Sequence, residues 1–111
     1  MRKFLLLTLI SAALFGCGSK TLSIDIAIDN GFQKTKPKLF QAIGAKDGWS
    51  GTWAGDDVEL YEYESSDAVR AELLEPAAAP GNASGWVELC VKENLLMLSK
   101  GANACRSLES I

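Results

Sequence analysis

The chain has 111 residues, of which 48% are hydrophobic, and a formal net charge of −3 at pH 7. This length allows one small domain, and the negative charge argues against nucleic acid or anionic lipid as an electrostatic partner. The chain contains no histidine, which excludes a histidine-based catalytic triad, a histidine general base and most zinc sites.

The N-terminal segment is typical of a secretory signal peptide. Arg2 and Lys3 precede an uncharged, mostly apolar run from Phe4 to Phe15. The run is too short for a membrane span, which needs roughly 20 apolar residues. We therefore predict that residues 1–16 are a signal peptide, the alternative being a buried N-terminal helix. Its removal takes two of the 11 basic residues, leaving 9 against 14 acidic ones and a net charge of −5.

Leu14-Phe15-Gly16-Cys17 resembles the lipobox of bacterial lipoproteins, although Phe15 is bulkier than the usual residue. The resemblance implies cleavage before Cys17, a diacylglyceryl group on its thiol and often an acyl chain on its new amine. Two or more acyl chains hold a protein firmly on a membrane. The alternative is an ordinary secreted protein cut near Cys17, which leaves an odd number of cysteines.

Residues 17–21 are then a lipidated tether, and residues 22–111 a single domain. In lipoproteins an aspartate after the cysteine commonly retains the protein in the inner membrane, and Gly18 stands there instead. In a bacterium with two membranes, the resemblance therefore implies a lipid anchor at the periplasmic face of the outer membrane.

The first elements of the domain are predicted to be two short helices. Residues 22–30 alternate as a strand would, but Ile24, Ile28 and Phe32 also share one helical face, and Gly31 suits the end of a helix. We favour the helix. A second short helix is expected from Pro37 to Ile43, ending at Gly44 or Gly48.

The segment 49–62 predicts a β-hairpin. With Gly55-Asp56 as a two-residue loop, Trp53 lies opposite Val58 and Gly51 opposite Leu60. One face is then mostly apolar, and the other carries Ser50, Thr52, Glu59, Tyr61 and Tyr63. This sorting by polarity is what a half-buried antiparallel pair requires.

A helix, a second hairpin and a final helix are expected in the C-terminal half. The helix covers residues 65–76, with Ser65 or Ser66 as N-cap and Pro76 at its end. A loop of small residues comes next. In the second hairpin, Glu93-Asn94 is the loop and Val91 lies opposite Leu96.

Cys90 falls on this hairpin and Cys105 on the helix expected over the last residues. Two cysteines in an exported small domain indicate a disulfide. The bond would close a loop of about 15 residues, worth roughly 3 kcal/mol in the chain-entropy model. The alternatives are two buried free thiols or, less in keeping with the sequence, a metal site.

The predicted fold class is α+β, with two β-hairpins forming an antiparallel or mixed four-stranded sheet packed with short helices. Two stretches, FQAIGAKDGWSGTW and VELYEYESSDAV, also make the domain resemble small bacterial lipoproteins of unassigned function. This second resemblance covers roughly a third of the chain and implies no activity.

We predict no metal site, cofactor or catalytic residue. The acidic residues Asp56, Asp57, Glu59, Glu62 and Glu64 lack the spacing of an EF-hand loop. Ser65 and Ser66 are better explained as helix caps than as nucleophiles paired with Lys100, because no oxyanion-hole or nucleophile-elbow pattern accompanies them.

Aromatic residues give the candidate binding surface. Trp49 and Trp53 are expected in the core, whereas Tyr61, Tyr63 and Trp86 are the candidates for an exposed surface. The predicted function is a lipid-anchored, non-enzymatic envelope domain that binds an envelope protein or small ligand. The alternatives are a small envelope enzyme or accessory subunit, and a purely structural or stress-related lipoprotein.

Overall fold

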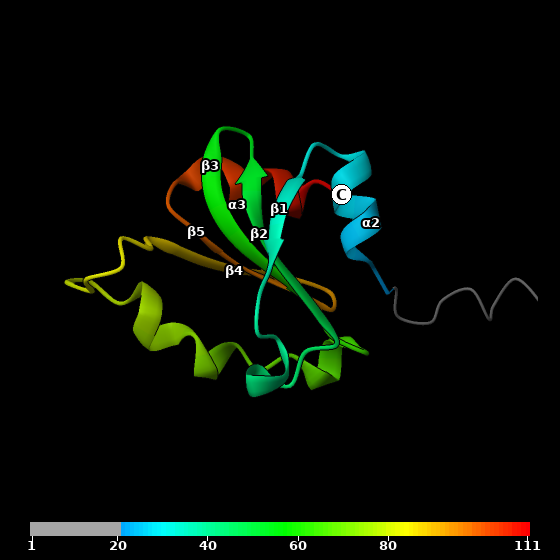
Figure 1. Cartoon of the computed structure of the whole chain (residues 1–111), viewed down its shortest axis with the longest axis horizontal. Coiled ribbons are helices and arrows are strands. Elements are labelled where there is room, and N and C mark those ends of the chain that lie inside the picture. The colour runs from blue at the N-terminus through cyan, green and yellow to red at the C-terminus, as the bar shows by residue number, and fades with distance from the viewer. Residues whose placement is uncertain (1–20) are drawn as a thin grey trace, which may run out of the picture.

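A five-stranded sheet forms the centre of the computed structural model, which describes residues 21–111 (Figure 1). The strands are β1 (Gln33–Pro37), β2 (Asp47–Trp53), β3 (Asp56–Glu62), β4 (Glu88–Lys92) and β5 (Leu95–Ser99). Their order is β1-β2-β3-β5-β4, and every pair is antiparallel. The α+β class is confirmed. The predicted signal peptide, the lipobox and Cys17 lie outside the described residues.

The prediction of four strands is wrong, because β1 adds a fifth at one edge. Its residues, Gln33 to Pro37, are all exposed, so the strand has no apolar alternation that could reveal it. Pro37 ends this strand and does not begin a helix. In place of the predicted helix there is a single 3₁₀ turn, Gln41–Ile43, closed by Gly44 with a φ of 78°.

The first hairpin turns one residue earlier than predicted. Ala54 and Gly55 form the loop, both with positive φ (52° and 87°), as a type I′ turn requires. Trp53 therefore pairs with Asp56 and Gly51 with Val58, so the predicted pairing is wrong. Moving the loop by one residue shifts the strand pairing by two residues. Because side chains point to the same face at every second residue, this shift leaves each residue on its predicted face. The predicted sorting of the two faces therefore survives.

The second hairpin matches its prediction. The loop is Glu93-Asn94, Val91 pairs with Leu96, and Leu89 pairs with Leu98. β5 is buried along its whole length and lies between β3 and β4.

Two α-helices confirm predictions from the sequence. Helix α2 (Ile24–Asp29) begins at Ser23, whose hydroxyl accepts a hydrogen bond from the Ile26 amide. It ends in a Schellman motif: Gly31 has a φ of 110°, and the Phe32 amide donates to the Ala27 carbonyl. Helix α3 (Ala102–Glu109) closes the chain.

The helix predicted over residues 65–76 does not form. Three 3₁₀ turns stand in its place: Ser66–Ala68, Ala71–Leu73 and Glu75–Ala78. Between the first two, Val69 has an extended backbone, which suits a β-branched residue. Both Val69 and Leu74 pack against the sheet.

Each face of the sheet has its own core. Helices α2 and α3 cover one face, where Trp53, Leu60 and Leu108 are buried. The segment of 3₁₀ turns covers part of the other face, where Tyr61, Tyr63 and Leu96 are buried. The helix-side core also contains Leu22, so the start of the described chain belongs to that layer.

Candidate functional site

Tyr61 and Tyr63 are core residues, so the prediction that they form an exposed surface is wrong. Their side chains are 5% and 0% exposed. The Tyr63 hydroxyl donates to the Ile43 carbonyl at 3.0 Å, and the Tyr61 hydroxyl donates to the Glu59 carboxylate at 2.8 Å. The sequence suggested exposure because polar residues share this face, but the 3₁₀ segment covers the part that holds the tyrosines.

These surroundings keep both tyrosines protonated. Burial raises the pKa of Tyr61, and the hydrogen bond to the Glu59 carboxylate raises it further. Burial also raises the pKa of Tyr63, although Arg70 partly opposes this effect. Both side chains are buried and both hydroxyls are bonded within the protein, so neither tyrosine contributes to the surface.

Trp86 is the predicted surface residue that remains partly exposed, and the loop that presents it is hydrogen-bonded through one side chain. The Asn82 side chain makes five hydrogen bonds within this loop. Its amide nitrogen donates to the carbonyls of Ala79 and Trp86 at 2.9 and 2.8 Å. Its carbonyl oxygen accepts from both groups of Ser84 and from the Gly85 amide. Asn82 was not among the predicted site residues, although an asparagine among small residues is a known signal of such turns.

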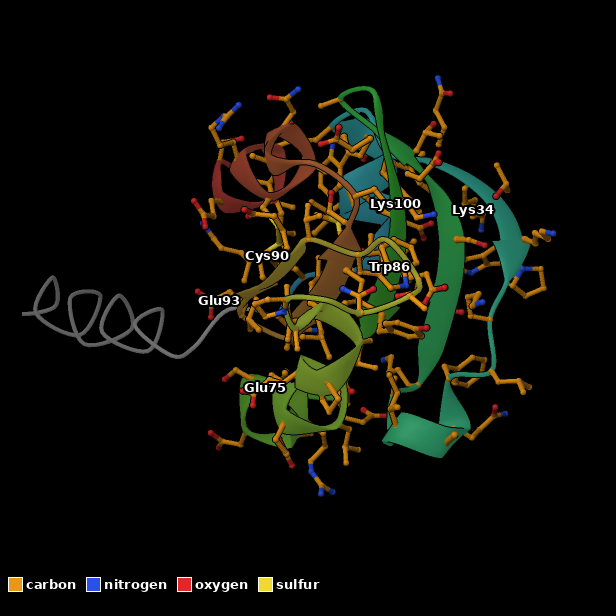
Figure 2. The ribbon with its side chains drawn as sticks, turned by 90° about the vertical axis from the view of Figure 1, so that its left-hand side faces the viewer. Lys34, Glu75, Trp86, Cys90, Glu93 and Lys100 are labelled. Atoms are coloured by element: carbon orange, nitrogen blue, oxygen red, sulfur yellow. A yellow bond between two sulfur atoms is a disulfide. The ribbon has the colours of Figure 1, made fainter. Side chains whose placement is uncertain are left out.

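Lys100 completes this surface site. Its ammonium lies 5.2 Å from the centre of the Trp86 ring, a distance that permits a cation–π contact. Gly85, with a φ of 86°, brings the loop against the Lys100 side chain. Figure 2 shows Trp86 and Lys100 side by side. We call this pair the Trp86–Lys100 site.

The site lies at one end of β4 and β5, and Leu22 lies at the other. The Asn94 side chain, in the loop between these strands, accepts from the Leu22 amide at 2.6 Å and donates to the Leu22 carbonyl at 2.8 Å. Five-residue strands separate the two ends, a length of roughly 17 Å.

A pocket of about 270 Å³ lies beside Leu22. Its lining includes Lys46, Glu62, Glu64 and Asn94. Lys46 forms ion pairs with Glu62 at 3.5 Å and Glu64 at 4.0 Å, and Glu62 also accepts a hydrogen bond from the Ile24 amide. These polar groups are therefore engaged with one another and with the residues that lead into α2.

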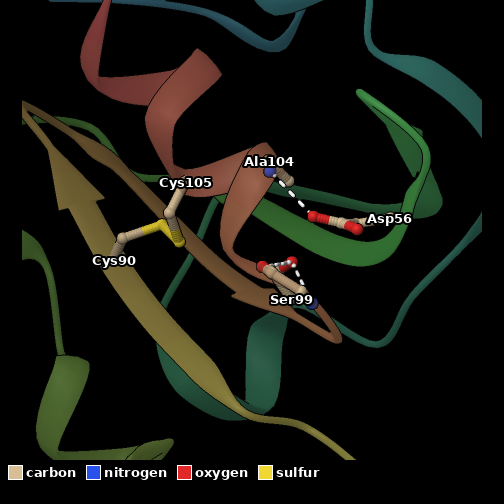
Figure 3. The surroundings of a disulfide bond; sticks show 6 residues. Asp56, Cys90, Ser99, Ala104 and Cys105 are labelled. Atoms are coloured by element: carbon tan, nitrogen blue, oxygen red, sulfur yellow. Dashed lines mark hydrogen bonds between the residues drawn. A yellow bond between two sulfur atoms is a disulfide. The ribbon is translucent and has the colours of Figure 1, made fainter.

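The acidic residues of the first hairpin have structural partners. The Asp56 carboxylate accepts a hydrogen bond from the Ala104 amide at 2.9 Å, in the first turn of α3 (Figure 3). This is a helix cap supplied from 48 residues away, because Gly101 at the N-cap has no side chain to provide one. Glu59 pairs with Lys38 at 3.1 Å. Within residues 21–111, no three acidic or cysteine side chains gather as a metal site would need.

The disulfide between Cys90 and Cys105 is confirmed. The two Cα atoms lie 6.0 Å apart, and the bond joins α3 to β4 (Figure 3). Beside it, the Ser99 hydroxyl donates to the Gly101 carbonyl and accepts from the Gly101 amide. The start of α3 is therefore fixed to the sheet by a covalent bond and by caps.

The structure does not bring the serines and Lys100 together. Ser65 and Ser66 come after β3, near the first residue of β5, because Glu62 pairs with Leu95. Lys100 comes after the last residue of β5, a strand length away. Ser65 precedes the 3₁₀ turn Ser66–Ala68 and makes no side-chain cap hydrogen bond, so the predicted helix cap is wrong.

Comparison with known protein families, curated proteins and solved structures finds no significant match. Across the described range, no helix combines the length and the apolar character needed to cross a bilayer.

Proposed function

We propose that this protein is a lipid-anchored domain of the bacterial cell envelope that binds a ligand without catalysing a reaction. The lipobox-like sequence ending at Cys17 supports the anchor, and the periplasmic face of the outer membrane is the proposed location. The Cys90–Cys105 disulfide fits this address, because such bonds persist in oxidising compartments. Leu22 is bound to Asn94, and five residues from Cys17 span at most ~18 Å. The domain therefore stays close to the bilayer.

The observation that carries the binding role is the partly exposed indole of Trp86 beside the Lys100 ammonium. The five hydrogen bonds of Asn82 hold the backbone of the loop that presents this indole. An indole face and an ammonium together suit a ligand with a sugar ring and a carboxylate. Soluble muropeptides combine both groups, and they are the probe we choose.

The anchor is tested by mass spectrometry of the mature protein and by membrane fractionation. The expected N-terminus is an acylated Cys17, and the Cys17→Ala variant should remain an uncleaved precursor without acyl chains. A mature N-terminus elsewhere, or a Cys17 without acyl mass, would refute the lipid anchor.

The binding role is tested separately, with the full mature protein in detergent and muropeptides as titrant. NMR shifts of the Trp86 indole should saturate, and Trp86→Ala should weaken binding at least about tenfold, a loss typical of a stacked aromatic anchor. Leu39→Ala is the matched control, because Leu39 is 82% exposed and remote in sequence from the site. Equal affinities of the Trp86→Ala and Leu39→Ala variants would contradict a role for the indole.

A further inference from the structure

Strand β4 leaves one edge of the sheet open. Lys92 and Leu95 flank the two-residue loop of the second hairpin, so their backbone groups bond to each other. Because inward and outward groups alternate along an antiparallel strand, Cys90 also bonds to β5, while Leu89 and Val91 direct their N–H and C=O groups away from it. Within residues 21–111, no other residue hydrogen-bonds these four outward groups.

The side chains of this edge are partly apolar and accessible. Val91 is 44% exposed, and Val87, just before the strand, is 60% exposed. An edge with free backbone groups and exposed β-branched residues is a template for another strand.

The sequence of β4 complements itself. The strand reads Glu-Leu-Cys-Val-Lys, with opposite charges at its two ends. When two copies run antiparallel with Cys90 opposite Cys90, Leu89 of each lies opposite Val91 of the other, and Glu88 opposite Lys92. This register pairs the residues whose backbone groups face outward. It also places opposite charges directly across from each other, which stabilises a strand pair.

We propose that the protein forms a symmetric dimer through β4, with one sheet continuing across both copies. Shifting the register by two residues in either direction keeps the hydrogen bonds but separates Glu88 from Lys92. The charges therefore select one register, and the partner they select is a second copy of this chain.

The symmetry of this dimer is compatible with two anchors in one membrane. The two-fold axis is perpendicular to the sheet and passes through the Cys90 positions, so both copies turn the same face in the same direction. Leu22 lies in the helix-side layer, so Leu22 of both copies is on that side of the sheet. A five-residue strand pair is a small interface, but anchoring in one bilayer raises the effective concentration of the two copies.

The test is sedimentation equilibrium of the mature lipidated protein in density-matched detergent. Glu88→Lys replaces two attractive pairs by two repulsive ones, and should raise the dimer dissociation constant about tenfold. Lys92→Glu should do the same, although it also removes the hydrogen bond from the Lys92 ammonium to the Glu109 carbonyl of its own chain, so its urea-unfolding midpoint is measured beside its dissociation constant. The double variant Glu88→Lys/Lys92→Glu restores the pairs in reverse and should return the constant to within about threefold of the wild-type value.

A second variant separates pairing from charge. Val91→Pro removes one outward N–H and leaves the bonds to β5 intact, so it should abolish the dimer while its urea-unfolding midpoint stays close to that of the wild type. A wild-type protein that is monomeric at millimolar concentration would overturn the proposal. So would a charge-reversed double variant no tighter than Glu88→Lys, or a folded Val91→Pro protein that still dimerises.

Discussion

The two edges of the sheet are built differently. β1 is protected against other strands by exposed lysines, by a register shift between Lys34 and Lys36, and by Pro37. These are the features that natural proteins use to prevent edge-to-edge pairing. β4 has neither proline nor a register shift along its pairing with β5, and exposes Val91. The contrast teaches that one edge is closed to partners while the other remains available.

The edges also differ in how they are attached to the rest of the domain. β4 is bound covalently to α3 by the Cys90–Cys105 bond, and the Lys92 ammonium donates to the Glu109 carbonyl at 2.7 Å. β1 is attached by its ladder to β2, where Gly51 allows a close approach to Gln33 and Phe32. Lys34 adds a contact 4.1 Å from the centre of the Trp49 ring. Each mode of attachment can be broken separately.

The largest effect is expected from breaking the disulfide. The Cys90→Ala/Cys105→Ala variant should lose about 3 kcal/mol of unfolding free energy, because the bond no longer restricts a loop of about 15 residues in the unfolded chain. Urea unfolding with and without reductant measures this difference. Reductant should destabilise the wild type and leave the variant unchanged. Equal unfolding curves for the wild type in both conditions would show that the bond contributes nothing to stability.

A smaller loss is expected at the opposite edge. In Gly51→Ala, the new Cβ would overlap the Gln33 carbonyl oxygen and the Phe32 ring, so β1 must move away from β2. We expect a loss of about 1–3 kcal/mol, the usual cost of overpacking. Amide hydrogen exchange should show the loss of protection first in β1.

The matched control for this change is Thr52→Ala, at the neighbouring position of β2. Thr52 is paired with Gln33 but only partly buried, so its truncation should change stability by no more than about 0.5 kcal/mol. A Gly51→Ala protein as stable as this control, with β1 still protected, would show that the close approach is dispensable.

The same contrast explains what the sequence could predict. The β4–β5 hairpin was predicted in its correct register because Leu89, Val91, Leu96 and Leu98 alternate around a two-residue loop. β1 was missed because protecting an edge requires lysine and proline, which remove the apolar pattern of a strand. The disulfide could be inferred by counting cysteines. The cap that Asp56 supplies to the Ala104 amide could not, because the two residues are 48 positions apart in the sequence.

The candidate site was only partly predictable, for a related reason. Trp86 was named as an aromatic residue of the second hairpin and is partly exposed just before β4, but Tyr61 and Tyr63 were misplaced. Their burial depends on the irregular 3₁₀ segment that packs against them. Because this segment has no helical periodicity, its sequence does not predict that it covers the sheet. Asn82 belongs to the site because it bonds the backbone of the loop, and Lys100 because it lies near Trp86 in space. Neither relation can be predicted from a single sequence.

The smallest effect on stability, and the sharpest test of the two edges, is expected from Pro37→Thr. The Lys38 amide donates to the Gly48 carbonyl, so alternation places the nitrogen of Pro37 on the outer side of β1. Threonine would add an outward N–H there and lower the unfolding free energy by no more than about 1 kcal/mol, mainly through a more flexible unfolded chain. The change is best made in the Val91→Pro protein, whose β4 edge is closed. Light scattering at high concentration should then show new association, which Val91→Pro alone does not show. If the double variant remains monomeric, the lysines and the register shift close the β1 edge without help from proline, and the contrast between the edges rests on those two features.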